Sequence, residues 1–261
     1  MKNIISLLVL SAALVCISFN TAGLREYKID KIVIDAGHGG RDPGTHGKYS
    51  NEKDIALKIA LETGRIIQEN IPSVEVIYTR EKDSYPSLAA RAELANKNGA
   101  DLFISIHCNS APYSTKVHGT ETYVMGLHKT EENFEVAKRE NSVISLEENS
   151  DEVYDGFDPS SPESYILFSL YQNAYIQNSL MMAQNVEDQF QNRVGRRSRG
   201  VKQAGFLVLW KTSMPSILVE TGYLSNEKEE KELNDKLQQT YIASGIFRAF
   251  RQYKQDIESL N

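Results

Sequence analysis

The feature that most constrains the fold is an alternation of short apolar runs with longer helical patterns. The runs at 31–36, 74–79 and 102–107 are short and rich in β-branched residues, which is typical of buried strands. Between them, residues 52–67 and 88–96 carry apolar side chains at helical spacing. Strands that alternate with helices predict an α/β sandwich with a largely parallel sheet.

The remaining patterns extend this prediction toward the carboxyl end. Apolar runs predict strands at 119–125, 206–209 and 216–220, and the polar alternation in the first of these predicts a half-exposed strand. Helical spacing predicts a long helix over 163–191 and a closing helix over 241–253. No internal repeat or proline-rich linker divides the chain, so we expect one domain after the amino-terminal segment.

Residues 1–23 have the layout of a secretory signal peptide. Lys2 gives a positive start, residues 4–17 are almost wholly apolar, and Thr21, Ala22 and Gly23 are small. The apolar run is shorter than the roughly 20 residues of a membrane span. A lipid-anchored alternative requires Cys16, but Val15 stands where a small residue is expected. We therefore expect an exported mature chain of residues 24–261 with no stable membrane span.

Charge and cysteine content exclude several classes. The chain has 29 Lys and Arg against 35 Asp and Glu, a net charge of −6, which argues against a nucleic-acid partner. Two cysteines exclude a four-cysteine zinc site and a disulfide scaffold. After signal removal Cys108 is the single cysteine, so no intramolecular disulfide is expected.

Titratable residues stand at the ends of three predicted strands. His38 follows the first strand within a glycine-rich turn, His107 ends the third strand, and Glu220 ends the last. The carboxyl ends of parallel strands are where active groups gather. Glu52, at the start of the next helix, is 14 residues after His38 and can fold back toward it. Two imidazoles and one carboxylate form a three-ligand catalytic zinc set, which leaves Glu220 as a candidate base.

Other catalytic schemes fit less well. The sequence contains no Gly-x-Ser-x-Gly elbow and no phosphate-binding loop. Cys108 adjoins His107, but neighbouring strand residues point to opposite faces, so its thiol is expected to fill the core.

Several blocks, in order, resemble the zinc-dependent N-acetylmuramoyl-L-alanine amidases that hydrolyse peptidoglycan. They are VIDAGHGGRDPGTHG at 33–47, NEKDIAL at 51–57, TR at 79–80, LFISIHCN at 102–109, GTETYV at 119–124 and ILVETGYLSN at 217–226. The resemblance covers nearly the whole mature chain. It implies a three-layer sandwich in which a twisted, mostly parallel sheet of about six strands is flanked by helices.

The same resemblance implies the site and the reaction. One Zn²⁺ ion would be held by His38, Glu52 and His107, with Glu220 as the catalytic glutamate. The implied reaction cleaves the amide between N-acetylmuramic acid and L-alanine, in cell-wall remodelling or daughter-cell separation. Thr221 and Tyr223 depart slightly from the family pattern. His46, His118 and His128 match no ligand position and are expected near the surface.

Two charged segments remain. Residues 128–165 hold 11 acidic side chains, and some relatives in this family carry at this place a helical insertion that blocks the zinc site until a partner displaces it. A glutamate of this segment is therefore a candidate plug; the alternative is a lid or a substrate-binding wall.

The basic run at 193–202 is expected either to meet carboxylates of the stem peptide or to cap the preceding helix.

Two competing functions stay open. A zinc peptidase that cuts within the stem peptide would use the same metal chemistry. An inactive wall-binding regulator would be expected to lack a ligand or the glutamate, and all four residues are present. Export, together with the insertion, favours a periplasmic location, with secretion outside the cell as the second expectation.

Overall fold

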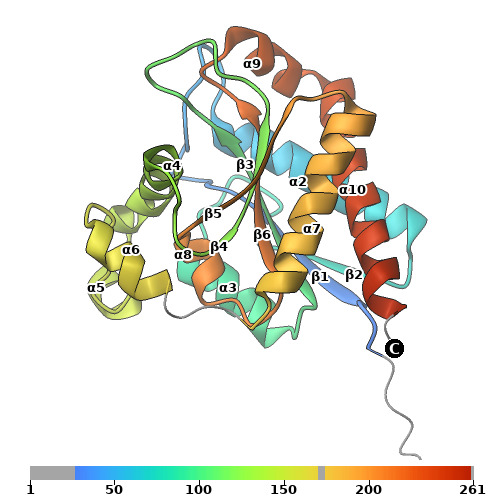
Figure 1. The fold of residues 1–261 in the computed structure, drawn as a ribbon, viewed down its shortest axis with the longest axis horizontal. Coiled ribbons are helices and arrows are strands. Elements are labelled where there is room, and N and C mark those ends of the chain that lie inside the picture. Colours follow the sequence, from blue (N-terminus) through green and yellow to red (C-terminus); the bar gives the residue numbers. More distant parts are fainter. Residues whose placement is uncertain (1–26, 170–173, 260–261) are drawn as a thin grey trace, which may run out of the picture.

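A six-stranded sheet forms the centre of the molecule in the computed structural model, which describes residues 27–169 and 174–259 (Figure 1). The strand order is β2-β1-β3-β6-β4-β5. All neighbouring strands run parallel except β4 and β6. The strands are β1 (Lys31–Ala36), β2 (Glu75–Tyr78), β3 (Leu102–Asn109), β4 (Thr120–Met125), β5 (Ser198–Ala204) and β6 (Ser216–Tyr223). The predicted mostly parallel sheet is confirmed.

Helices cover both faces of the sheet and complete three layers (Figure 1). One face is covered by α2 (Glu52–Asn70), α7 (Ile176–Gln189) and α10 (Lys236–Glu258). The other is covered by α3 (Leu88–Lys97), α4 (Glu131–Asn141) and α8 (Leu207–Trp210). The short helix α9 (Glu227–Asn234) follows β6. The predicted three-layer α/β sandwich is therefore confirmed.

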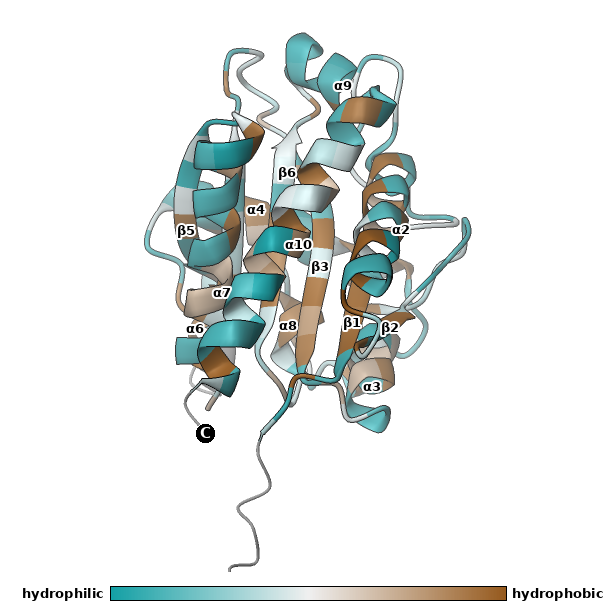
Figure 2. Ribbon diagram, turned by 90° about the vertical axis from the view of Figure 1, so that its right-hand side faces the viewer, coloured by the Kyte–Doolittle hydropathy of each residue, from teal (hydrophilic) through white to brown (hydrophobic). Residues whose placement is uncertain are grey.

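Each central strand supplies side chains to both hydrophobic cores. On β1, Ile32 and Ile34 belong to the core on the side of α2, α7 and α10, whereas Val33 belongs to the core on the opposite face. Successive strand residues point to opposite sides, so a strand buried on both faces is apolar along its length. Figure 2 shows this as brown segments along β1 and β3, while α7 and α10 turn teal faces outward.

The acidic segment at 128–165 folds into helices that pack on the sheet. After α4 come the 3-10 helix η1 (Ser142–Leu146), α5 (Ser150–Val153) and the beginning of α6 (Pro162–Ser169). Its apolar side chains, among them Phe134, Ile144, Tyr154 and Tyr165, are buried with Phe206 and Leu209 in the second core. The acidic residues thus belong to a folded layer that is docked on the domain.

Two strand predictions were wrong in detail. Residues 206–209 were expected to be a strand, but α8 is a short helix, because a brief apolar run does not by itself distinguish the two structures. The strand that completes the six-stranded sheet is instead β5, which was not predicted and which residues of the basic run largely form. The strand at 119–125 was expected to be half exposed, yet β4 is buried throughout, because β5 and β6 flank it and side chains pack on both of its faces.

The long helix predicted over 163–191 was also wrong. Helix α6 ends at Ser169 and α7 begins at Ile176, and residues 170–173 lie outside the described ranges. Helix α7 runs into a π-helical turn, η2 (Phe190–Val194), which Gly195 ends in a left-handed conformation. Glycine adopts this conformation without steric cost, so it is a common helix terminator.

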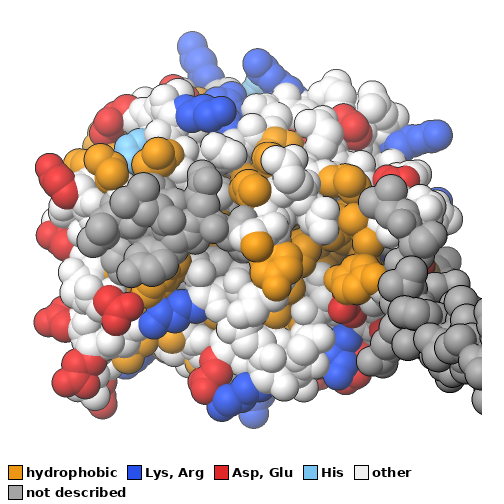
Figure 3. Space-filling model, turned by 60° about the horizontal axis from the view of Figure 1, so that its bottom comes forward, with side chains coloured by type: hydrophobic (Ala, Val, Ile, Leu, Met, Phe, Trp, Pro, Cys, Tyr) orange, Lys and Arg blue, Asp and Glu red, His pale blue; other side chains and the backbone are white. Residues whose placement is uncertain are grey.

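The surface of the described residues carries both charged and apolar side chains. None of the helices within 27–169 and 174–259 combines the length and apolar character of a membrane span. Figure 3 shows a face on which hydrophobic side chains gather centrally while charged side chains lie toward the rim. Some large apolar side chains remain exposed, such as Ile166 at 52%. The proposed signal segment 1–23 lies outside the described residues.

Candidate metal centre and active site

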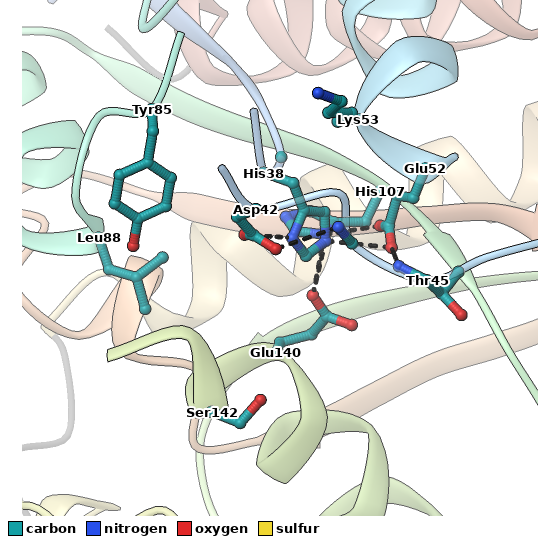
Figure 4. A network of polar contacts seen from close by, with 12 residues as sticks. His38, Asp42, Thr45, Glu52, Lys53, Tyr85, Leu88, His107, Glu140 and Ser142 are labelled. Atoms are coloured by element: carbon teal, nitrogen blue, oxygen red, sulfur yellow. Dashed lines mark hydrogen bonds and ion pairs between the residues drawn. The ribbon is translucent and has the colours of Figure 1, made fainter. Parts of the chain in front are cut away.

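Three elements deliver the predicted metal ligands to one place. His38 lies in the loop after β1, Glu52 is the first residue of α2, and His107 lies on β3. Figure 4 shows these side chains pointing toward one another, together with Glu140 from α4. One ligand atom from each of the four lies within 4.8 Å of the others, and all four residues are buried. The donor set is two imidazoles and two carboxylates.

The short distances converge on the two imidazoles. Nε2 of His38 lies 3.1 Å from Oε2 of Glu52 and 3.1 Å from Oε2 of Glu140. Nδ1 of His107 lies 3.0 Å from Oε1 of Glu52 and 3.2 Å from Oε2 of Glu140. Within the described residues, Nε2 of His38 and Oε2 of Glu140 make no hydrogen bond of acceptable geometry. Buried polar atoms are rarely left without a partner, so these atoms fit a shared cation.

Asp42 orients the His38 ring. Its carboxylate lies 2.7 Å from Nδ1 of His38 and also accepts a hydrogen bond from the backbone N–H of Gly44. A carboxylate on one ring nitrogen fixes the proton there and leaves Nε2 as a ligand. This is the arrangement expected behind a metal-binding histidine.

Two buried arginines hold the backbone that carries His38. Arg91 donates to the carbonyls of Ala36 and His38, and Arg80 donates to those of Ala36 and Gly37. Arg91 is itself paired with buried Asp35 at 2.7 Å. His38 has a φ of 60°, which is uncommon for a residue other than glycine. These charge-assisted bonds stabilise the conformation that aims the ring at Glu52.

Backbone donors and close packing position Glu52. The N–H groups of Thr45 and Cys108 each donate to its carboxylate at 2.8 Å. Burial alone would raise the pKa of Glu52, but the two histidines outweigh it and hold the pKa below its usual range. A Cβ at Gly37 would lie 2.4 Å from the His107 ring, and one at Gly44 would lie 2.6 Å from the His38 ring. The glycine-rich turn is therefore required for the rings to approach.

Glu140 is the residue of the acidic segment that reaches the cluster. Burial would raise its pKa, but His38 and His107 hold it well below the usual range, so it is a carboxylate here. Its neighbour Arg139 donates to Oδ1 of Asn109 at 2.9 Å and to the carbonyl of Ser110. A glutamate of this segment was expected as a candidate plug, but the sequence did not single out Glu140 among 11 acidic residues.

Glu220 lies beside the four-residue cluster. On β6 it pairs in register with His107 of β3 and, on its other side, with Glu121 of β4. It is fully buried, and neither carboxylate oxygen has a hydrogen-bond partner among the described residues. Burial and the negative charges of Glu140 and Glu52 raise the pKa of Glu220 well above its usual range. The surroundings of Glu220 in this structure therefore favour its protonated form more than water does.

The other histidines and Cys108 lie outside the cluster. His46 contacts Asn51, His118 contacts the carbonyl of Lys116, and His128 packs on Phe134 and Tyr165. Asn51, at the N-cap position of α2, makes this contact and no side-chain capping bond. Cys108 is a buried free thiol within the first core, as predicted.

The basic run is built into the fold. Arg196 pairs with Glu229 and Glu232 of α9, while Arg199 and Lys202 of β5 pair with Glu121. Arg193 lies in the last, π-helical turn after α7. Arg193 thus has the position of a helix-capping cation, whereas Arg196, Arg199 and Lys202 form ion pairs within the fold.

Arg91→Met should destabilise the fold by about 3–5 kcal/mol, because it leaves the carboxylate of Asp35 buried without its charge partner. Urea denaturation followed by circular dichroism measures this change. Arg65→Met is the matched control, since Arg65 forms solvent-exposed pairs with Glu62 and Glu69, and its loss should change the stability far less than the loss of Arg91. Equal losses in the two variants would contradict a special role for Arg91.

The fold and the site together define an α/β protein with a candidate metal centre at the end of a parallel sheet. The family model described as N-acetylmuramoyl-L-alanine amidase matches residues 32–252. The chain belongs to this family and is an enzyme of this class, a peptidoglycan amidase.

Individual relatives agree with the family assignment. AmiA of Escherichia coli K12, an N-acetylmuramoyl-L-alanine amidase, is 33% identical over 82% of this chain and 73% of its own length. AmiC of Escherichia coli O6:H1 is 31% identical over 86% of this chain, which spans only 53% of AmiC. A crystal structure of an N-acetylmuramoyl-L-alanine amidase from Clostridium difficile 630 is 28% identical, covers 87% of this chain and 97% of its own, and has a TM-score of 0.64.

Proposed function

We propose that this chain is a zinc-dependent amidase that cleaves the bond between N-acetylmuramic acid and L-alanine in peptidoglycan. The observation that carries the proposal is the convergence of His38, Glu52 and His107, with Glu220 next to His107 across the sheet, in a chain of this family. One ion is proposed, held by those three residues.

The residues present fit a zinc ion. The donors are imidazole nitrogen and carboxylate oxygen, the types that catalytic zinc sites combine in threes, and the unpartnered Nε2 of His38 faces the cluster. When bound, zinc supplies Lewis-acid polarisation of the scissile carbonyl and activation of a water molecule. Three protein ligands would leave room on such an ion for substrate or water, and in this structure Glu140 contacts both of the histidines that would hold it.

Glu220 is proposed as the general base and acid. Its carboxylate takes a proton from the attacking water and passes it to the departing amine of L-alanine. Burial and the negative charges of Glu140 and Glu52 raise its pKa in the closed form, so withdrawal of Glu140 would remove one cause of this rise. The same movement would therefore uncover His38, Glu52 and His107 and lower the pKa of Glu220 toward that of a general base.

We further propose that α4 is an autoinhibitory element and that a protein partner displaces it. Glu140 contacts both imidazoles, Arg139 anchors the helix at the end of β3, and Glu147 accepts hydrogen bonds from Tyr85 and Tyr154. The CwlD amidase from Clostridioides difficile, 27% identical with a TM-score of 0.63, is solved in complex with the GerS lipoprotein. That complex supports the presence of protein partners among similar amidases.

The mature protein is proposed to be residues 24–261, a single catalytic domain in which 128–165 acts as a regulatory lid. The amino-terminal pattern supports export, with the periplasm as the proposed location and the cell exterior as the second. Peptidoglycan lies in both places, and the proposed roles are cell-wall remodelling and daughter-cell separation.

The proposal is tested by digesting purified peptidoglycan with residues 24–261, with zinc and with a chelator. The expected products are free stem peptides that begin with L-alanine and glycan without peptide, identified by mass spectrometry and lost with chelator. Cuts within the peptide would instead establish the peptidase. An absence of products from both the wild-type chain and the Glu140→Ala variant would contradict catalysis.

Asp42→Ala should lower zinc affinity about 10–100-fold, because the His38 ring loses the carboxylate that fixes its protonation and orientation. Competition titration with a zinc indicator measures the affinity. Asp188→Ala, which changes an exposed carboxylate of α7 that accepts a hydrogen bond from Gln184, is the matched control and should bind zinc as the wild type does.

A further inference from the structure

A cavity of about 500 Å³ lies beside the candidate metal centre. Its walls come from the segment after β3, from β4 and β5, from the end of β6 and from α4. It is distinct from the cluster of His38, Glu52, His107 and Glu140. The proposed function uses none of the side chains that line it except Arg139, which anchors α4. Three cations line it: Arg139, Arg199 and Lys202.

The floor of the cavity is organised around one buried carboxylate. Glu121, 1% exposed, accepts hydrogen bonds from Asn109, Tyr123 and Tyr223 and pairs with Arg199 at 2.7 Å and Lys202 at 2.6 Å. Two cations on one carboxylate leave a surplus positive charge. Arg199 and Lys202 keep donors beyond those that Glu121 uses, because guanidinium and ammonium groups each carry several. The floor is thus rigid and ready to receive an anion.

Strand register places this floor in line with the catalytic residues. His107, Glu220 and Glu121 are successive register partners across β3, β6 and β4, so their side chains share one face of the sheet. Strands lie about 4.8 Å apart, so Glu121 is about 10 Å from His107 along this row. An extended peptide advances about 3.3–3.6 Å per residue. Two to three residues beyond the scissile amide therefore reach Arg199 and Lys202.

We propose that this cavity is the stem-peptide subsite and that Arg199 and Lys202 bind a free carboxylate on the second or third residue of the peptide. The inference rests on the proposed amide hydrolysis. The surplus charge selects the peptide side of the substrate, since the glycan offers neutral hydroxyl and amide groups. Bidentate or paired contacts from such cations give both affinity and orientation.

Helix α4 presents a partial mimic of this ligand. Glu131, Glu132 and Glu135 of α4 line the same cavity opposite Arg199 and Lys202. The closed form therefore places carboxylates at the cationic floor while Glu140 faces the metal ligands. Substrate and α4 compete for both halves of the site, so binding of an anionic peptide favours the open form.

The test uses pairs of muramoyl-L-alanyl peptides whose second residue carries either a free carboxylate or the corresponding amide. With the zinc-loaded Glu140→Ala chain, we expect kcat/KM to be about 10- to 100-fold higher for the acid, the range for a lost charge-assisted hydrogen bond. The ratio of two substrates is independent of the fraction of folded enzyme. Calorimetry with the corresponding product peptides measures the same preference without turnover.

Three variants locate the preference. Lys202→Gln leaves the charges of Glu121 and Arg199 in balance at the floor, so the acid-to-amide ratio should fall, while the contribution of Arg139 from α4 stays the same in every variant. Adding Glu121→Gln to Lys202→Gln restores one positive charge and should restore much of the ratio, which a merely structural role of Lys202 does not predict. Arg193→Gln removes a charge from the same basic run outside this cavity and should leave the ratio unchanged.

The outcomes separate the two proposals. Equal binding of acid and amide peptides by the Glu140→Ala chain would overturn the subsite. A preference that Lys202→Gln does not diminish would also overturn it. Failure to cleave either substrate while the binding preference persists would overturn the proposed reaction and leave the carboxylate subsite supported.

Discussion

Glu220→Gln should lower amidase activity to below about 1% of the wild-type rate while the chain still binds one zinc ion. Removal of a general base typically costs 10²–10⁴-fold, and Gln keeps the size of the side chain without accepting a proton. Glu220 lies outside the set of four side chains that converge, so the metal site should survive the change.

The measurement for Glu220→Gln combines product release from peptidoglycan with zinc content by elemental analysis. Thermal unfolding serves as the control for folding. Near-normal turnover would contradict the assigned role. Loss of zinc together with activity would instead make Glu220 part of the metal site.

Glu140→Ala should raise the basal amidase rate about 10- to 100-fold. The substitution removes the carboxylate that contacts both imidazoles. Hydrogen bonds to charged groups contribute roughly 1.5–3 kcal/mol of free energy. The hydrophobic contacts of Phe134 and Val136 remain, so α4 should stay folded and the variant should remain a folded protein.

The rate of the Glu140→Ala variant is measured by dye release from labelled peptidoglycan. Glu148→Ala is the matched control, because Glu148 is an exposed glutamate of the same segment. An unchanged rate in Glu140→Ala, with zinc bound, would show that α4 does not inhibit. An equal rise in both variants would point to general loosening of the segment.

Local pattern was sufficient for the strands and helices that are buried with a regular period. β1, β3 and β6 are continuous apolar runs, and α2 and α10 have one apolar face, so their types follow from sequence. β5 offers no such signal: it is an edge strand, and its sequence SRGVKQA is mostly polar. Its structure depends on pairing with β4, which is a tertiary contact.

The site residues also differ in whether local sequence pattern or tertiary contact places them. His38 follows β1, whereas His107 and Glu220 lie near the carboxyl ends of β3 and β6, and the topology of a parallel sheet brings such positions to one edge. Glu140 depends on how α4 docks. A signal was present, since Asn133, Val136, Ala137 and Glu140 share the buried face of that helix, and an acidic residue on a buried face is unusual. The number of acidic residues around it obscured this pattern.

The measurement that tests the account most directly is a crystal structure of the zinc-loaded chain with diffraction data collected on both sides of the zinc absorption edge. The account predicts one anomalous peak, contacted by His38, Glu52 and His107, with Glu140 at the remaining position. A peak at other residues, or none at this cluster after zinc loading, would contradict the proposed metal centre.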